Sequence, residues 1–258
     1  MVQYQAPAAL LQGRTILVTG ASAGIGREAA LSYARHGARL ILLGRDAGRL
    51  DAVSRQIITD GAPSPHVLCC DLMTLSPAQS QALADDLARR FGHLDGLLHC
   101  AGLLGSITPL AQQAYSEWQS VMQVNLNAAF LLTRDLLPLL RRAERASIIF
   151  TSSSVGRAGR AGWGAYAVSK FATEGLMQVW AQELAGSAIR VNAINPGATR
   201  TAMRASAFPG EDPQTLRTPA QIMPLYLYLM GDDSLGENGR SWMPSRGGAP
   251  GQPVNPST

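Results

Sequence analysis

Tyr166 and Lys170 are the residue pair with the clearest chemical potential, in the stretch G-A-Y-A-V-S-K over residues 164–170. Residues four apart on a helix share a face, so the phenol and the ammonium group would be neighbours. A nearby positive charge favours the phenolate and lowers the tyrosine pKa from its ordinary value of about 10. The pair therefore predicts a general acid for carbonyl reduction and a general base for alcohol oxidation. The spacing alone is also common on helix surfaces, so its meaning depends on what accompanies it.

Two polar residues accompany the pair. Ser153 lies thirteen residues before Tyr166, in T-S-S-S-V-G after an apolar run. A serine at the carboxyl end of a strand is placed to hydrogen-bond a substrate oxygen. Asn125, in M-Q-V-N-L-N, falls inside a helical stretch, where asparagine is a poor helix former. It is either a tolerated kink or a group whose side chain or freed carbonyl holds a water beside Lys170.

A glycine-rich turn predicts a phosphate site. Residues 19–26 read T-G-A-S-A-G-I-G, directly after a short apolar run and directly before a helical stretch. Such a turn must be tight, must let the backbone approach a pyrophosphate, and must let the helix pack on the strand. The amides at the start of the helix then face the negative charge. In this strand–turn–helix context the turn indicates a dinucleotide site.

The end of the next apolar run distinguishes an NAD site from an NADP site. It ends L-L-G-R-D, with Gly44 where an NAD site usually places the acid for the ribose 2′-hydroxyl. A missing carboxylate removes the repulsion toward a 2′-phosphate, and the guanidinium of Arg45 can pair with that phosphate in bidentate fashion. Asp46 is expected to cap the following helix. These residues favour NADP(H), with NAD(H) the alternative.

The elements that position these residues alternate regularly. Apolar runs typical of strands buried on both faces fall at 15–18, 39–43, 67–70, 94–100, 147–151 and 189–194. Amphipathic helical stretches lie between them at about 25–36, 46–59, 77–91, 112–142 and 165–185. This alternation predicts a single Rossmann-type, doubly wound α/β sheet of about seven mostly parallel strands, with helices on both faces. The ligand site is then expected outside the carboxyl ends of the strands.

The chain reads as one domain over residues 1–258. Residues 1–11 are expected to form an N-terminal extension, and the Gly- and Pro-rich residues 245–258 a loose tail or surface arm. The net charge of +4 is spread over the chain, with no basic run typical of nucleic-acid binding. No apolar run reaches the ~20 residues that span a bilayer, and three cysteines, two of them adjacent, form no disulfide framework. These observations predict a cytoplasmic protein with no metal, nucleic-acid or membrane partner.

Taken together, the sequence resembles the classical short-chain dehydrogenase/reductase family over about residues 12–243. Within that family it is most similar to the YciK group of bacterial oxidoreductases. The resemblance is carried by ILVTGAS-x-GIGREAA, ILLGR, LDG-x-LH-x-AGLLG, FTSSSVGR, WGAYA-x-SKFATEG, INPG-x-TRTAMRASAFP and IMPLYL-x-LMGDD.

The resemblance implies a role for each matching residue. Ser153 would orient the carbonyl, Tyr166 transfer the proton, Lys170 hold the nicotinamide ribose and tune Tyr166, and Asn125 keep a relay water. The pyrophosphate would lie on residues 19–26, the adenine amine near Asp71, and the carboxamide side of the nicotinamide on residues 196–201. The implied nucleotide contacts, besides Tyr166 and Lys170, are Gly20, Ser22, Ala23, Gly24, Ile25, Gly26, Arg45, Asp71, Leu72, Cys100, Ala101, Gly102, Pro196, Gly197, Thr199 and Thr201.

One position departs from the family pattern. Where the family usually reads N-N-A-G, this chain has His99-Cys100-Ala101-Gly102. The Ala-Gly backbone is kept, but the amide side chains that usually brace the sheet are replaced. Cys100 is taken as a small buried residue, and redox sensing is the minor alternative.

Two segments are expected to flank the substrate. Residues 156–164 carry Arg157, Arg160 and Trp163, and residues 202–210 follow the nicotinamide segment as a possible lid. The arginines either recognise an anionic group on the substrate or are surface charge. The resemblance also implies a homodimer or homotetramer built on the long helices.

The leading functional hypothesis is an NADP(H)-dependent oxidoreductase that interconverts a carbonyl compound and its alcohol, such as a 3-oxoacyl or other ketone reductase. Reduction is the favoured direction. The alternative is an NADP(H)-binding sensor or regulatory protein with little catalysis. Serine hydrolysis is disfavoured because the chain has no histidine placed to activate Ser153.

Overall fold

The fold is a single sheet covered by helices on both faces, as the alternating pattern predicts. The computed structural model describes residues 4–245 and 251–253. In the described residues the strand order is β3-β2-β1-β4-β5-β6-β7-β8, and every neighbouring pair except β7–β8 is parallel. The strands are β1 Thr15–Thr19, β2 Arg39–Gly44, β3 His66–Cys69, β4 Gly96–His99, β5 Ala146–Thr151, β6 Ile189–Ile194, β7 Ser241–Met243 and β8 Gln252–Pro253.

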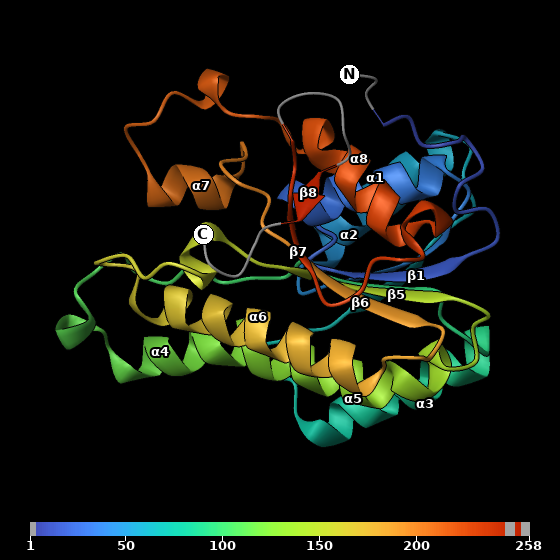
Figure 1. Ribbon diagram of the computed structural model, residues 1–258, viewed down its shortest axis with the longest axis horizontal. Helices are drawn as coiled ribbons and strands as arrows, with labels where there is room; N and C mark the ends of the chain where they lie inside the picture. The colour runs from blue at the N-terminus through green and yellow to red at the C-terminus, as the bar shows by residue number, and fades with distance from the viewer. Residues whose placement is uncertain (1–3, 246–250, 254–258) are drawn as a thin grey trace.

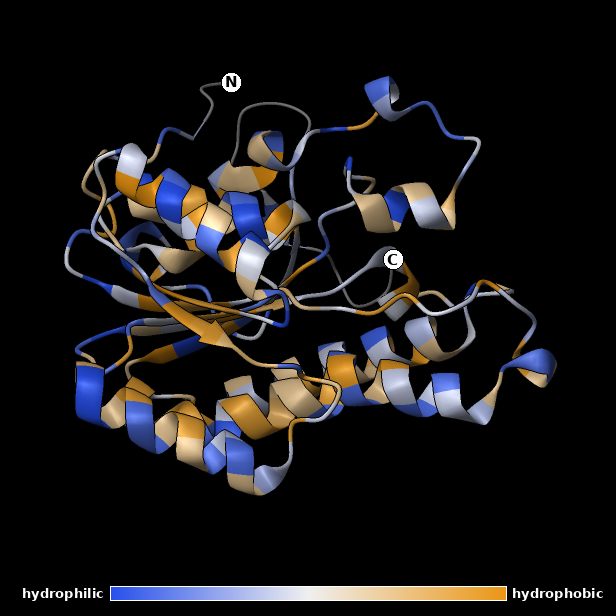
Figure 2. Cartoon of the chain, turned by 180° about the vertical axis from the view of Figure 1, so that it is seen from behind, coloured by the Kyte–Doolittle hydropathy of each residue, from blue (hydrophilic) through white to orange (hydrophobic). Residues whose placement is uncertain are grey.

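Two helical layers enclose the sheet (Figure 1). One layer holds α1 (Gly24–Arg35), α2 (Ala47–Thr59) and α8 (Pro219–Met230), and the other holds α3 (Pro77–Phe91), α4 (Tyr115–Met122), α5 (Ala128–Leu140) and α6 (Gly164–Glu183). Figure 2 shows the apolar strands between the two layers. Each sheet face carries its own apolar core, so the strands are buried on both sides.

The helices begin where capping residues predict. Asp46 accepts a hydrogen bond from the Arg49 amide at the start of α2, which confirms the expected cap. Ser76 and Thr218 each form a capping box with the glutamine three residues on, and a proline follows each of them. The short helix α7 (Ala202–Ala207) is capped by Thr201 and lies apart from both layers, on the side where α6 begins (Figure 1).

Some expected boundaries were wrong. The single helix expected over residues 112–142 is a short 3₁₀ turn at Leu110–Gln112 followed by α4, a π-helical turn at Gln123–Asn127 and α5. The strand expected over 94–100 is confined to 96–99, because the flanking residues leave the regular ladder. An eighth strand, β8, pairs antiparallel with β7 inside the expected loose tail. Residues 1–3, 246–250 and 254–258 lie outside the described residues.

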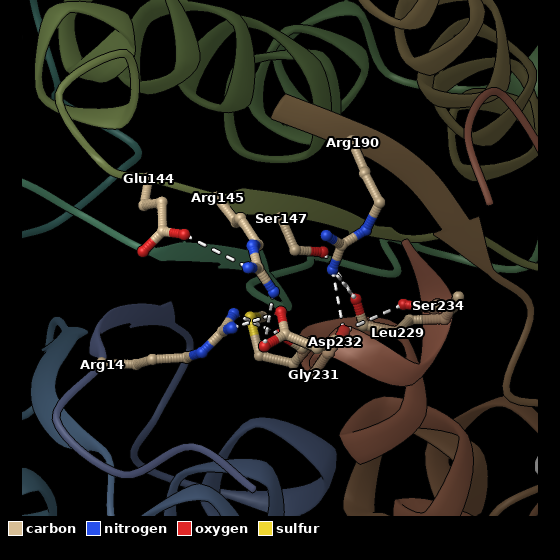
Figure 3. A network of polar contacts seen from close by, with 10 residues as sticks. Arg14, Glu144, Arg145, Ser147, Arg190, Leu229, Gly231, Asp232 and Ser234 are labelled. Carbon is tan, nitrogen blue, oxygen red and sulfur yellow. Dashed lines mark hydrogen bonds and ion pairs between the residues drawn. The ribbon is translucent and has the colours of Figure 1, made fainter. Parts of the chain in front are cut away.

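A polar network fixes the end of α8 against the amino ends of the strands, opposite the expected ligand site (Figure 3). Asp232 forms ion pairs with Arg14 and, at 3.2 Å, with Arg145. Buried Arg190 donates to the carbonyls of Leu229 at 3.4 Å and Gly231 at 2.9 Å. Positive side chains are favourable at a helix C-terminus, where carbonyl groups lack partners in the helix.

Asp232→Asn is expected to destabilise the fold by about 1 kcal/mol, because it removes a carboxylate that lies among three guanidinium groups but is 40% exposed to screening solvent. Urea unfolding measures the change in free energy, which should shrink in high salt if it is electrostatic. Asp233→Asn is the matched control, since the neighbouring Asp233 contacts the exposed Tyr4 hydroxyl at 2.8 Å. Equal stability of the two variants would contradict the prediction.

Candidate active site

The glycine-rich turn has the close approaches that its sequence predicts. Gly20 has a φ of 68°, and a Cβ there would lie 2.8 Å from the Ala101 backbone. A Cβ on Gly26 would lie 2.4 Å from the Gly20 carbonyl oxygen, so α1 packs directly on the turn. Ala23 precedes α1 and offers no side-chain cap, which leaves the first amides of the helix facing outward. This cradle fits a pyrophosphate.

The end of β2 lies against the same turn. A Cβ on Gly44 would lie 3.6 Å from the Ser22 hydroxyl oxygen, and Arg45 follows as an exposed side chain. At the end of β3, Asp71 is exposed and Leu72 is buried. The implied contacts to the ribose and the adenine therefore lie at neighbouring strand ends, which is compatible with one bound dinucleotide.

Three of the four expected catalytic residues meet at the end of β5. The Ser153 hydroxyl is close enough to the Tyr166 phenol to lower its pKa. The Lys170 Nζ donates to the Thr151 carbonyl at 2.7 Å and lies 5.5 Å from the centroid of the Tyr166 ring. A Cβ on Gly102 would lie 4.0 Å from Nζ, so the kept Ala-Gly backbone borders the group.

The electrostatics of Tyr166 differ from the expectation that its pKa is lowered. Burial raises the pKa of Tyr166 to about 12, and the hydrogen bond from Ser153 only partly opposes this. Tyr166 is therefore fully protonated at neutral pH, the state that a general acid needs. Burial also lowers the pKa of Lys170 to about 8, against the opposing effects of Cys100 and Glu174.

Asn125 completes the group from the π-helical turn between α4 and α5. Its side chain accepts a hydrogen bond from the Leu103 amide at 2.7 Å and donates to the Leu103 carbonyl and the Ser169 hydroxyl, each at 2.9 Å. These bonds occupy the side chain and tie the turn to the loop after β4 and to α6. Of the two groups considered for holding a water, the backbone carbonyl is therefore the better placed.

His99 and Cys100, which stand where the family usually has two asparagines, make other contacts at the end of β4. The buried His99 ring stacks on Phe150 at 4.8 Å, and its Nε2 lies 2.8 Å from the Thr133 hydroxyl. Burial lowers the pKa of His99 to about 3, so the ring is neutral. Burial raises the pKa of Cys100 to about 11, so its thiol is un-ionised, which fits a small packed residue better than a redox sensor.

The nicotinamide segment (residues 196–201) and the lid segment (residues 202–210) lie against the two halves of the site. Thr201 approaches the phosphate turn, with its Cγ2 3.4 Å from a Cβ built on Gly24. Met203 reaches the catalytic end, with its Cε 3.7 Å from a Cβ built on Gly102. The backbone of Pro196 and Gly197, just after β6, is held by bonds to the side chains of Thr199 and Asn195.

An apolar cluster stands beside Tyr166. The Trp163 ring lies 5.8 Å from the Tyr166 ring and 5.7 Å from Phe208 of the lid segment. Arg160 is exposed and lies over both Trp163 and Phe208. Arg157, by contrast, contacts the carboxylate of Glu174 at 3.6 Å, so only Arg160 keeps the position expected of a residue that faces substrate.

Two sets of contacts that brace the site, made by Thr19 and Gln123, were not predicted from the sequence. The Thr19 hydroxyl accepts hydrogen bonds from the amides of Cys100 at 3.0 Å and Ala101 at 3.1 Å, and so joins β1 to β4 at the site. Gln123 donates to the carbonyls of Leu72 and Leu75, each at 3.2 Å, and holds the loop after β3. Thr19 stands at the head of the glycine-rich turn, a position that could have signalled its role, whereas Gln123 carries no such signal.

Two other kinds of site have no support in the described part of the chain. No cluster of three or more His, Cys, Asp or Glu side chains there is arranged to hold a metal ion. Among the described helices, none combines the length and the apolar character that crossing a membrane requires.

Comparison with known proteins places this geometry in a family. The sequence model of the short chain dehydrogenases matches residues 14–212. The oxidoreductase YciK of Escherichia coli K12 is 56% identical over 250 residues, which cover 97% of this chain and 99% of YciK.

Solved structures agree with that comparison. A short chain dehydrogenase of Shigella flexneri 2a, crystallised with NADP, is 56% identical, with a TM-score of 0.90 over 92% of this chain and 99% of that one. A short chain dehydrogenase of Escherichia coli CFT073, crystallised with NADPH, is 57% identical, with a TM-score of 0.90 over 92% and 98%. The chain therefore belongs to the short-chain dehydrogenase/reductase family, within its YciK-like group, and is an oxidoreductase.

Proposed function

We propose that this oxidoreductase uses NADPH to reduce a ketone or aldehyde to the alcohol. The observation that carries the proposal is the meeting of Tyr166, Ser153 and Lys170 at the end of β5, beside a pyrophosphate cradle. A protonated phenol next to a serine hydroxyl provides two donors for one carbonyl oxygen.

NADP(H) is the proposed cofactor, with NAD(H) the alternative. Gly44 leaves no carboxylate at the end of β2, and the exposed Arg45 is placed to pair with a 2′-phosphate. The NADP and NADPH bound to the two related structures support this choice. The groups proposed to contact the nucleotide are Gly20, Ser22, Ala23, Gly24, Ile25, Gly26, Arg45, Asp71, Leu72, Cys100, Ala101, Gly102, Tyr166, Lys170, Pro196, Gly197, Thr199 and Thr201.

Each protein group has a defined task. The nicotinamide supplies the hydride to the carbonyl carbon when it is bound. Ser153 donates a hydrogen bond to the carbonyl oxygen and orients it, and Tyr166 gives that oxygen its proton. The Lys170 ammonium then stabilises the Tyr166 phenolate until a proton returns.

The return of the proton needs a path from the interior. A small cavity behind Lys170 is lined by polar groups of Thr19, His99, Asn125 and Thr173. A buried water needs two to four polar partners, which these side chains and backbone groups provide. We place the relay water in this cavity, next to the Asn125 carbonyl.

The surroundings of Tyr166 favour a substrate with an apolar flank. Trp163, Leu104 and Val155 are buried next to the phenol, and Met203 and Phe208 pack on them from the lid segment. An apolar wall excludes water from the reacting carbonyl and strengthens the hydrogen bonds to it.

A homodimer or homotetramer is proposed on the outer faces of α5 and α6. Phe130, Phe171 and Val179 are exposed there by 40%, 44% and 54%. Apolar side chains gathered on neighbouring helices are typical of a protein interface. Light scattering of the wild type, compared with a variant carrying Phe171→Glu, would measure the assembly.

A carbonyl panel tests the proposed function. Wild-type protein is mixed with ketones and aldehydes of increasing apolar bulk, and oxidation of NADPH or NADH is followed at 340 nm. Turnover with NADPH of at least one carbonyl compound supports the proposal. Tight NADPH binding without any turnover would instead support a sensor or regulatory protein.

Loss of the Lys170 charge is expected to lower enzyme activity at alkaline pH. The pKa of Lys170 is about 8, so the ammonium is present below that pH and is lost above it. Its loss weakens the hydrogen bonds that Lys170 donates to the nicotinamide ribose and removes the charge that stabilises the phenolate. We expect kcat/KM for NADPH, which reports the free enzyme, to fall above about pH 8. A flat profile up to pH 10 would contradict this assignment.

A further inference from the structure

A buried polar cluster joins the catalytic helix to the loop that carries Ser153. Glu174 follows Lys170 by one helical turn on α6 and is only 5% exposed. Its carboxylate lies 3.6 Å from the Arg157 Nε and accepts a hydrogen bond from the Ser241 hydroxyl at 2.9 Å. Arg157 in turn donates to the same hydroxyl at 3.0 Å. The three side chains come from α6, from the loop after β5 and from β7.

A second contact holds the same loop on the same turn of α6. A Cβ on Gly156 would lie 2.9 Å from the Lys170 carbonyl oxygen and 3.1 Å from the Lys170 Cβ. The short 3₁₀ turn at Ser154–Gly156 therefore rests directly on the backbone of Lys170. Arg157 immediately follows this turn, so its ion pair acts on the segment that begins with Ser153.

We propose that Arg157 and Glu174 are positioning residues that clamp the Ser153 loop to the Lys170 turn of α6. This inference rests on the proposed function, because its effect is on the hydrogen bond between Ser153 and Tyr166 and on the Lys170 ammonium beside them. The clamp touches neither reacting atoms nor the phosphate cradle. It therefore acts on the chemical step and leaves the phosphate cradle unchanged.

The local chemistry explains why a charged pair is used. A buried ion pair adds little net stability compared with apolar side chains, since both charges lose their hydration. It does fix direction here through the Ser241 hydroxyl, which accepts a hydrogen bond from Arg157 and donates one to Glu174, while the Arg157 Nε itself makes no hydrogen bond. Glu174 also faces the Lys170 ammonium, which otherwise has the Thr151 carbonyl and the Cys100 thiol as polar neighbours, and it favours the charged state of that lysine.

The first test is the isosteric Glu174→Gln variant, with Glu183→Gln as the matched control on the exposed face of the same helix. A misplaced catalytic group has a large effect on rate, so we expect kcat to fall by about tenfold or more in Glu174→Gln. Well below pH 8, where Lys170 stays charged, the KM for NADPH should stay within about twofold of wild type, because the phosphate cradle is untouched. Amide hydrogen exchange over residues 153–157 should become faster in this variant and not in the control.

The second test separates positioning from stability. The double variant Arg157→Met with Glu174→Met replaces the pair by apolar side chains, which generally preserves folding stability. We expect its melting temperature to be near that of wild type while kcat stays reduced by about tenfold. If kcat recovers together with the melting temperature, the pair has only a structural role and the proposal is overturned.

Failure of the clamp and failure of the proposed function give different results. Full kcat in Glu174→Gln, with an active wild type, overturns the clamp alone. A wild type that turns over no carbonyl compound overturns the proposed function. In that case the exchange rates of residues 153–157 still decide the clamp, because unchanged exchange in Glu174→Gln shows that the pair does not hold the loop.

Discussion

Replacing Tyr166 by phenylalanine is expected to lower kcat for carbonyl reduction by about a thousandfold, within the range of about 10²–10⁴ for loss of a general acid. Ser153 would still hydrogen-bond the carbonyl oxygen, but no positioned proton would reach it. The ring itself remains, so the packing against Trp163 at 5.8 Å should persist. The affinity for NADPH should then stay within about twofold, because ribose contacts through Lys170 are kept.

The measurement compares turnover and nucleotide binding on the same preparations. Initial rates at saturating NADPH give kcat, and quenching of intrinsic fluorescence gives the dissociation constant of NADPH. Tyr115→Phe is the matched control, because it makes the same change at a tyrosine that is 72% exposed and far along the chain. Equal turnover in wild type and Tyr166→Phe would reject Tyr166 as the acid.

The parts of the site that the sequence predicted are those whose chemistry depends on local spacing. The Gly20–Gly26 turn, the Asp46 cap and the Tyr166–Lys170 pair each lie within one turn or helix, so their geometry follows from a few consecutive residues. The alternation of apolar runs and helical stretches predicted the parallel sheet for the same reason.

Contacts between residues far apart in the sequence could not be predicted from local spacing. The hydrogen bonds from the amides of Cys100 and Ala101 to the Thr19 hydroxyl join segments about eighty residues apart. The place of Thr19 at the head of the glycine-rich turn marks the residue but does not predict these partners. The burial of Arg157 against Glu174 depends on how α6 packs on the loop. The sequence does not show this packing, so it left open a role for Arg157 in substrate recognition. The elevated pKa of Tyr166 likewise reflects enclosure by the fold, whereas the sequence shows only the neighbouring lysine.

The π-helical turn shows how a side chain can override a helical pattern. The apolar periodicity of residues 112–142 predicts one continuous helix, but Asn125 bonds both backbone groups of Leu103 in the loop after β4. These bonds are made where the helix widens into a π-helical turn at 123–127. Asn125, a poor helix former, is thus held beside the site by the π-helical turn and its bonds to Leu103.

The double variant Gly44→Asp with Arg45→Ala is expected to shift the kcat/KM preference for NADPH over NADH by about a thousandfold toward NADH. Loss of charge-assisted hydrogen bonds to a 2′-phosphate costs about 3 kcal/mol, and a carboxylate placed nearby adds repulsion. Each 1.4 kcal/mol corresponds to a factor of about ten. The new carboxylate would also accept a bond from the 2′-hydroxyl of NADH.

The change requires a small adjustment of the core. A Cβ on Gly44 would lie 3.3 Å from the Cδ2 of the fully buried Leu50, which must move by a few tenths of an ångström. The same Cβ would lie 3.6 Å from the Ser22 hydroxyl, which puts the new carboxylate beside the phosphate turn. Arg49→Ala is the matched control, because Arg49 is an exposed arginine one turn along α2 that pairs with Asp46.

Single variants separate the two causes of the preference. Arg45→Ala alone should weaken NADPH binding and leave NADH binding unchanged, because only the 2′-phosphate loses its partner. Gly44→Asp alone should weaken NADPH and strengthen NADH, because the carboxylate acts on both. A large preference for NADPH that survives in the double variant would show that the 2′-phosphate is recognised elsewhere, and the assignment of Arg45 would then be wrong.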